Sequence, residues 1–148
     1  MPDNLSRSST SDSAWSISMS SNLAGLKQGL NGLGSWLESN KIELETENRA
    51  RLVFEEIVTN VIRYGFSDSA EHVINAVAEV DDEDLTLSFD DDGRPFDPRT
   101  APAPKPDHSL AQASIGGRGL MLVRAAARLI DYERTEGRNR LTVTLPRQ

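Results

Sequence analysis

The chain of 148 residues contains no cysteine and only two histidines. Without cysteine it cannot form disulfide bonds, use a thiolate nucleophile or bind zinc through sulfur. The two histidines, His72 and His108, are far apart in the sequence and form no HExxH or related pattern, which argues against a histidine-based transition-metal site. Disulfide, thiol and histidine–metal chemistry are therefore set aside.

Basic residues, aromatic residues and long apolar runs are also scarce. Sixteen lysines and arginines against 23 aspartates and glutamates give a formal net charge of −7, which is poorly suited to displacing the counterions of a nucleic acid. Two tryptophans and four phenylalanines are too few to suggest stacking platforms for bases. No apolar run reaches the roughly 18 residues that span a bilayer, and the N-terminus lacks the basic and apolar regions of a signal peptide. We expect no nucleic-acid or membrane partner and a cytoplasmic location.

The spacing of apolar residues divides the rest of the chain into helices and strands. Residues 1–13 are rich in serine and aspartate and predict a disordered leader before a single domain at 14–148. Three- and four-residue spacing predicts helices at 22–39, 45–64 and 120–130, and alternation predicts strands at 14–20, 72–80, 85–89, 130–134 and 140–145. Residues of about 99–118 lack periodicity and predict a lid. The expected plan is an α+β two-layer sandwich: three helices on one face of a mixed, mostly antiparallel sheet of about five strands.

Three stretches of this plan carry candidate chemistry. Glu56 and Asn60 lie one turn apart on the polar side of the second helix, either as a solvated face or as two groups that act on one ligand. Asp91-Asp92-Gly93 follows a strand, either as an ordinary turn or as a carboxylate that accepts a hydrogen bond from a base amine. Gly116-Gly117-Arg118-Gly119 opens the third helix, either as a turn or as an anion site made of backbone N–H groups.

Taken together and in this order, the three stretches resemble the motifs of a known superfamily. Glu56-Ile57-Val58-Thr59-Asn60, Asp91-Asp92-Gly93 and Gly117-Arg118-Gly119-Leu120 are similar to the N box and the two glycine boxes of the GHKL ATPases, which include gyrase, heat-shock chaperones and histidine kinases. The ExxxTN pattern, the sequence DDGRPFDP and the compact size resemble those of the anti-sigma factor serine/threonine kinases of bacterial partner-switching systems. The resemblance covers residues 15–145 and implies the GHKL fold and the binding of ATP and Mg²⁺.

The resemblance also implies roles for single residues. Asn60 matches the asparagine that ligates Mg²⁺, and Glu56 matches the catalytic base that takes the proton from a serine or threonine hydroxyl. Asp91 matches the aspartate that binds adenine, and Thr142 matches a threonine of the adenine pocket. The remaining nucleotide-binding positions lie in the glycine boxes and the lid: Gly93, Gly116, Gly117, Arg118, Gly119 and Leu120.

The implied activity is phosphorylation of a serine on a small STAS-type anti-anti-sigma protein. Two departures from the family pattern leave an alternative open. Pro95 stands where the first glycine box often has a second glycine, and Ser114 stands near the place where some of these kinases have an arginine for the γ-phosphate. The alternative is a catalytically weak, nucleotide-dependent binding module that sequesters a sigma factor or another regulator. The glycine-rich first helix is either a homodimer face or part of the core.

Overall fold

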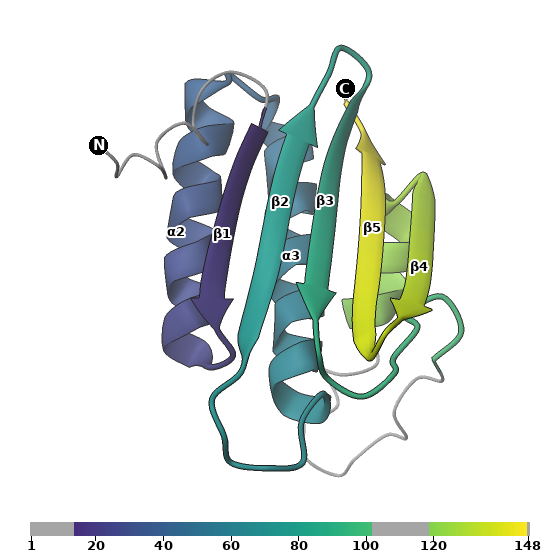
Figure 1. The fold of residues 1–148 in the computed structure, drawn as a ribbon. Helices are drawn as coiled ribbons and strands as arrows, with labels where there is room; N and C mark the ends of the chain where they lie inside the picture. Colours follow the sequence, from purple (N-terminus) through teal and green to yellow (C-terminus); the bar gives the residue numbers. More distant parts are fainter. Residues whose placement is uncertain (1–13, 102–118, 148) are drawn as a thin grey trace, which may run out of the picture.

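The computed structural model describes residues 14–101 and 119–147. Within these ranges, one face of a five-stranded sheet is covered by helices (Figure 1). The strands are β1 (Ala14–Ser20), β2 (Val73–Val80), β3 (Asp84–Asp91), β4 (Leu129–Thr135) and β5 (Arg138–Pro146), in the order β1-β2-β3-β5-β4. The helices are α2 (Leu23–Ser39), α3 (Leu44–Tyr64) and residues 119–126. The predicted α+β plan is confirmed, except that all strand pairs are antiparallel rather than mixed.

The helix α2 lies behind β1 and buries the apolar stripe that its sequence shows (Figure 1). Asn22 caps its first turn by accepting a hydrogen bond from the Gly25 N–H at 2.8 Å, as expected of an asparagine at this position. Leu33, Trp36 and Leu37 are almost completely buried. The core therefore accounts for most of this stripe, whereas Leu23 remains 74% exposed at the start of the helix.

The helix α3 crosses the middle of the sheet and carries the candidate residues in its second half. Phe54 is fully buried, and its ring lies 5.6 Å from that of Phe89 on β3, centroid to centroid. The helix ends at Gly65, whose N–H donates to the Val61 carbonyl. Packing of this apolar face brings the last turns of α3 beside the end of β3 (Figure 1).

The C-terminal third of the chain differs from the prediction in two places. The third helix ends at Ala126 rather than near residue 130, because Arg128 already donates to the Thr144 carbonyl of the sheet. The last hairpin turns through only two residues, Glu136 and Gly137, with φ values of 54° and 77°, a conformation typical of tight hairpins. As a result β5 begins at Arg138, and Asn139 is a buried strand residue rather than a turn residue.

Other expectations concern residues that the structure does not describe. The predicted leader at 1–13 and most of the predicted lid lie outside the described residues. None of the described helices is long and apolar enough to cross a bilayer.

Candidate functional site

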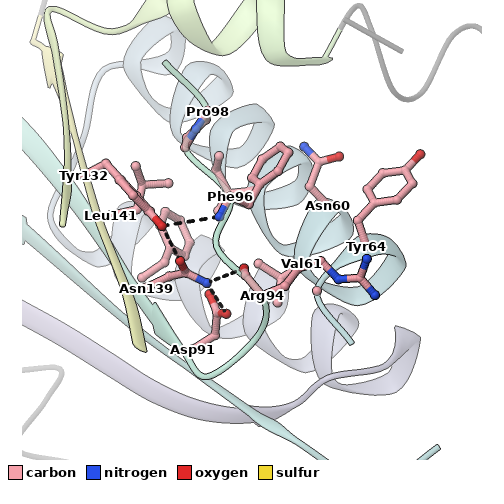
Figure 2. Close-up of a pocket in the computed structure, with 13 residues that line it drawn as sticks. Asn60, Val61, Tyr64, Asp91, Arg94, Phe96, Pro98, Tyr132, Asn139 and Leu141 are labelled. Atoms are coloured by element: carbon pink, nitrogen blue, oxygen red, sulfur yellow. Dashed lines mark hydrogen bonds between the residues drawn. The ribbon is translucent and has the colours of Figure 1, made fainter. Parts of the chain in front are cut away.

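A pocket opens where the last turns of α3 meet the end of β3, and Asn60 and Asp91 both line it (Figure 2). Its other walls are the loop after β3, which includes Phe96, and the buried sides of β4 and β5, which contribute Tyr132 and Leu141. Asp91 is only 4% exposed and Asn60 only 5%. Two buried polar side chains among apolar walls are typical of a site that orients a ligand.

The carboxylate of Asp91 is fixed by a chain of hydrogen bonds (Figure 2). Its Oδ1 atom accepts from the Gly93 N–H at 2.8 Å and from the Asn139 amide at 3.0 Å. The Asn139 amide also donates to the Arg94 carbonyl, and its oxygen accepts from the Tyr132 hydroxyl at 2.5 Å. The other Asp91 oxygen, Oδ2, makes no hydrogen bond with the described residues, so it can accept one from a ligand.

Asn139 and Tyr132 were not predicted from the sequence as site residues. A signal was present, because the alternation of Leu141, Val143 and Leu145 extends backward to residue 139 on the same face of the strand. An asparagine at a buried strand position needs hydrogen-bond partners. Starting the predicted strand at residue 140 concealed this signal.

Asn60 presents a buried carboxamide whose Nδ2 atom has no partner among the described residues. A buried amide without a partner fits a site that is completed by a ligand. Amide oxygens suit Mg²⁺, which also takes phosphate oxygens and water and needs few protein ligands. Among the described residues, no three acidic or histidine side chains are grouped so that they could hold a metal ion by themselves. The amide oxygen of Asn60 fits an ion that takes its other ligands from phosphate and water.

Glu56 lies one turn before Asn60, and its carboxylate is also without a partner: its buried Oε1 atom makes no hydrogen bond with the described residues. Burial raises the pKa of Glu56 and the nearby Glu55 raises it further, while Arg63 opposes both. Gly119 packs directly against this carboxylate, and any side chain at position 119 would overlap it. A partly buried carboxylate with a raised pKa is the form expected of a general base.

The other predicted residues fall in different places. Gly93 is buried beside Asp91, and Leu120 is buried in the third helix at 3% exposure. Gly116, Gly117, Arg118 and Ser114 lie outside the described residues.

Thr142 does not share the pocket of Asp91, and that prediction is wrong. Side chains alternate along a strand, so Leu141 faces the pocket while Thr142 points to the opposite face of the sheet. There its Oγ1 atom lies 3.4 Å from the Ser88 hydroxyl.

Comparison with known proteins agrees with this architecture. Residues 19–145 match the histidine kinase-like ATPase domain family. The serine/threonine-protein kinase BtrW of Bordetella bronchiseptica is 31% identical over 115 residues, which are 74% of this chain and 80% of that protein.

Two solved structures share the fold. The RsbU and RsbW domains of Rv1364c from Mycobacterium tuberculosis give a TM-score of 0.61 at 16% identity, covering 91% of this chain and 33% of that one. The SiaB–SiaC complex of Pseudomonas aeruginosa gives 0.58 at 12% identity, covering 99% and 98%.

The antiparallel sheet with helices on one face is therefore the fold of a histidine kinase-like ATPase domain. The chain belongs to this GHKL family and, within it, to the anti-sigma factor serine/threonine kinases. Membership of this family implies ATP binding and an activity of the kinase type.

Proposed function

We propose that the protein is an ATP- and Mg²⁺-dependent serine/threonine kinase of a cytoplasmic partner-switching system, and that it phosphorylates a serine on a STAS-type anti-anti-sigma protein. The observation that carries this proposal is the arrangement on α3 and β3. Asp91 and Asn60 share one pocket, and Glu56, with its unpartnered Oε1, lies one helical turn from Asn60. Asp91 can bind the adenine base, Asn60 can bind a metal-bound phosphate, and Glu56 can act on the acceptor hydroxyl.

The residues divide the work of phosphoryl transfer. Asp91 Oδ2 would accept a hydrogen bond from the adenine amine, while Asn139 and Gly93 hold Oδ1. Asn60 would supply an amide oxygen to Mg²⁺, which neutralises charge on the phosphates when it is bound. Glu56 would take the proton of the acceptor hydroxyl. The hydroxyl oxygen of the acceptor then bonds to the γ-phosphorus while the bond between the γ-phosphorus and the ADP oxygen breaks.

Phosphorylation of the acceptor would act as a switch through charge. A phosphoserine carries about two negative charges, and they would face a protein whose formal charge is −7. Repulsion would favour release of the phosphorylated partner and leave the kinase free to bind a second one, such as a sigma factor.

Two measurements test this function. Calorimetric titration with ATP should show binding that requires Mg²⁺ for full affinity and that Asp91→Asn abolishes. Thr142→Val, on the opposite face of the sheet, serves as the control and should bind ATP as the wild type does. Loss of binding in Thr142→Val with retention in Asp91→Asn would contradict the assignment of the pocket.

Phosphate transfer is then assayed with γ-labelled ATP against a panel of purified STAS-domain proteins and a degenerate mixture of serine- and threonine-centred peptides. The wild type should label a STAS protein, and Glu56→Gln should bind ATP but not transfer phosphate. ATP binding by the wild type without transfer to any acceptor would instead support the nucleotide-dependent binding module, which holds a sigma factor or another regulator.

A further inference from the structure

The helix α3 separates two hollows, and Glu56 lies in the one that does not contain Asp91. On the α2 side, a groove of about 430 Å³ runs between the first turn of α2 and the second half of α3, a volume within the range of ligand sites. Glu56 and Thr59 line this groove, whereas Asn60 lines the pocket on the other side. The groove and the pocket therefore approach each other across the single turn between Glu56 and Asn60.

The groove combines apolar and charged side chains that the fold itself does not use. Leu23 lines it at 74% exposure, next to Leu26 and Ile62. Glu55 and Arg63 line it as well and make no hydrogen bond or ion pair with the described residues. An exposed leucine beside charges without ion pairs favours a polypeptide partner over a small apolar ligand.

We propose that this groove binds the acceptor segment of the protein substrate, an inference that rests on the proposed kinase function. The occupant is a stretch of polypeptide that presents a serine or threonine hydroxyl to Glu56. A neighbouring apolar side chain contacts Leu23, Leu26 and Ile62, and charged side chains face Glu55 and Arg63. A hydroxyl that Glu56 deprotonates must reach its carboxylate, and among the described residues the groove is the hollow that Glu56 lines.

Two leucines of this chain form a matched pair for the test. Leu23 and Leu44 are each the first residue of a helix, α2 and α3, and they are 74% and 72% exposed. Only Leu23 lines the groove, while Leu44 follows Glu43, whose carboxylate is bonded to Arg147 near the end of β5. Because both are exposed, replacement by serine should leave the fold intact.

The experiment compares wild type, Leu23→Ser and Leu44→Ser with the STAS panel and the peptide mixture as acceptors. Leu23→Ser should raise KM for the acceptor about tenfold and leave kcat and the Kd for Mg²⁺-ATP within about twofold. Leu44→Ser should match the wild type in all three. An unchanged acceptor KM in Leu23→Ser would overturn the proposal, as would a loss of ATP affinity in place of the KM effect.

A second measurement reports occupancy directly. The chain has no cysteine, so Leu23→Cys introduces a single thiol at the mouth of the groove and Leu44→Cys introduces one outside it. The acceptor that the wild type phosphorylates should slow alkylation of the first thiol and not of the second, and equal rates would count against the groove. If the wild type binds ATP but phosphorylates no acceptor, the proposed function itself has failed, and the acceptor groove fails with it.

Discussion

One oxygen of Asp91 accepts two hydrogen bonds, and this leaves the second oxygen available to a nucleotide base. The buried Asn139 provides one of these bonds and is itself held by the Tyr132 hydroxyl. Asn139 therefore has a positioning role, since its amide holds the Asp91 carboxylate in place.

Asn139→Leu should weaken ATP binding by between about 10- and 100-fold, because a hydrogen bond to a charged group is worth about 1.5–3 kcal/mol. Tyr132→Phe removes the bonds of the hydroxyl to Asn139 and to the Phe96 N–H but leaves the bond between Asn139 and Asp91, and it should have a smaller effect. Calorimetric titration of both variants with ATP checks this order, and equal affinity in Asn139→Leu and wild type would contradict it.

Glu56 should make stability depend on pH. Its pKa is raised above the ordinary value of 4.5, chiefly by burial, so the folded state binds more protons than the unfolded state in the range just above that value. Stability contributed by this group is present at low pH and is lost as pH rises through the raised pKa. Glu56→Gln should therefore raise Tm at pH 8 and change it little at pH 4, whereas Glu38→Gln, on the exposed side of α2, should change it little at both.

The family resemblance assigned both Asn60 and Asp91 to nucleotide binding, and both line one pocket of the structure, while their roles toward ATP stay predictions. The assignment of Thr142 to the adenine pocket came from the resemblance, whereas the alternation of Leu141, Val143 and Leu145 puts Thr142 on the other face of β5. The turn has only two residues, so β5 starts at Arg138 rather than at residue 140, and Asn139 is a buried strand residue.

At the scale of elements, the position of α2 depends on close backbone contact with β1. A side chain at Gly25 would overlap the Ser20 carbonyl, whereas one at Gly34 would meet only the flexible end of Arg51. Both replacements by alanine gain about 1 kcal/mol of helix propensity, but overpacking against backbone costs about 1–3 kcal/mol.

Gly25→Ala should therefore lower the free energy of unfolding and Gly34→Ala should maintain or raise it. Urea unfolding followed by tryptophan fluorescence measures both, because Trp15 and Trp36 are 6% and 1% exposed in the fold. Equal stabilisation by the two alanines would show that α2 can move away from β1 at little cost.

A histidine connects the segment between α3 and β2 to the end of β3. The His72 ring stacks on Phe66 with centroids 3.8 Å apart, and its nitrogens lie 2.8 Å from Asp68 and 3.4 Å from Asp92. The hydrogen bond with Asp68 raises the pKa of His72, burial opposes this, and the charges of Asp68 and Asp92 raise the pKa further.

This contact should stabilise the fold at low pH and weaken as pH rises. A raised histidine pKa gives stability that is complete below about 6.5 and is lost as pH passes through the folded-state value. His72→Gln should flatten the decline of Tm between pH 6 and pH 9. A flat profile in the wild type would contradict the role of His72.

Most helices and strands were predictable because apolar periodicity is strong where an element has one buried face. The end of the third helix was not, since Ile130 fits both the helical spacing from Val123 and the alternation of β4. The Arg128 N–H donates to the Thr144 carbonyl of β5, and this bond ends the helix and starts β4. The local apolar pattern does not specify that these two residues pair.

For the whole molecule, the net charge of −7 should make partner release sensitive to salt. The wild type should bind the unphosphorylated acceptor more tightly than the phosphorylated one, and this ratio should shrink as salt rises from about 0.02 M to about 0.5 M, because the screening length falls well below about 10 Å. Affinities measured at the two salt concentrations check this. A ratio independent of salt would show that steric contact, rather than charge, releases the product.

The order of the sheet also has a consequence for synthesis on the ribosome. The edge strand β1 is made before its partner, and Trp15 lies opposite Ala78 of β2. The ribosome adds about 5–20 residues per second, so β1 lacks its partner strand β2 for on the order of several seconds. The outward residues of β1, Ser16, Ser18 and Ser20, are polar. While β1 lacks its partner strand, this face therefore exposes little apolar surface through which the nascent chain could mispair with other chains.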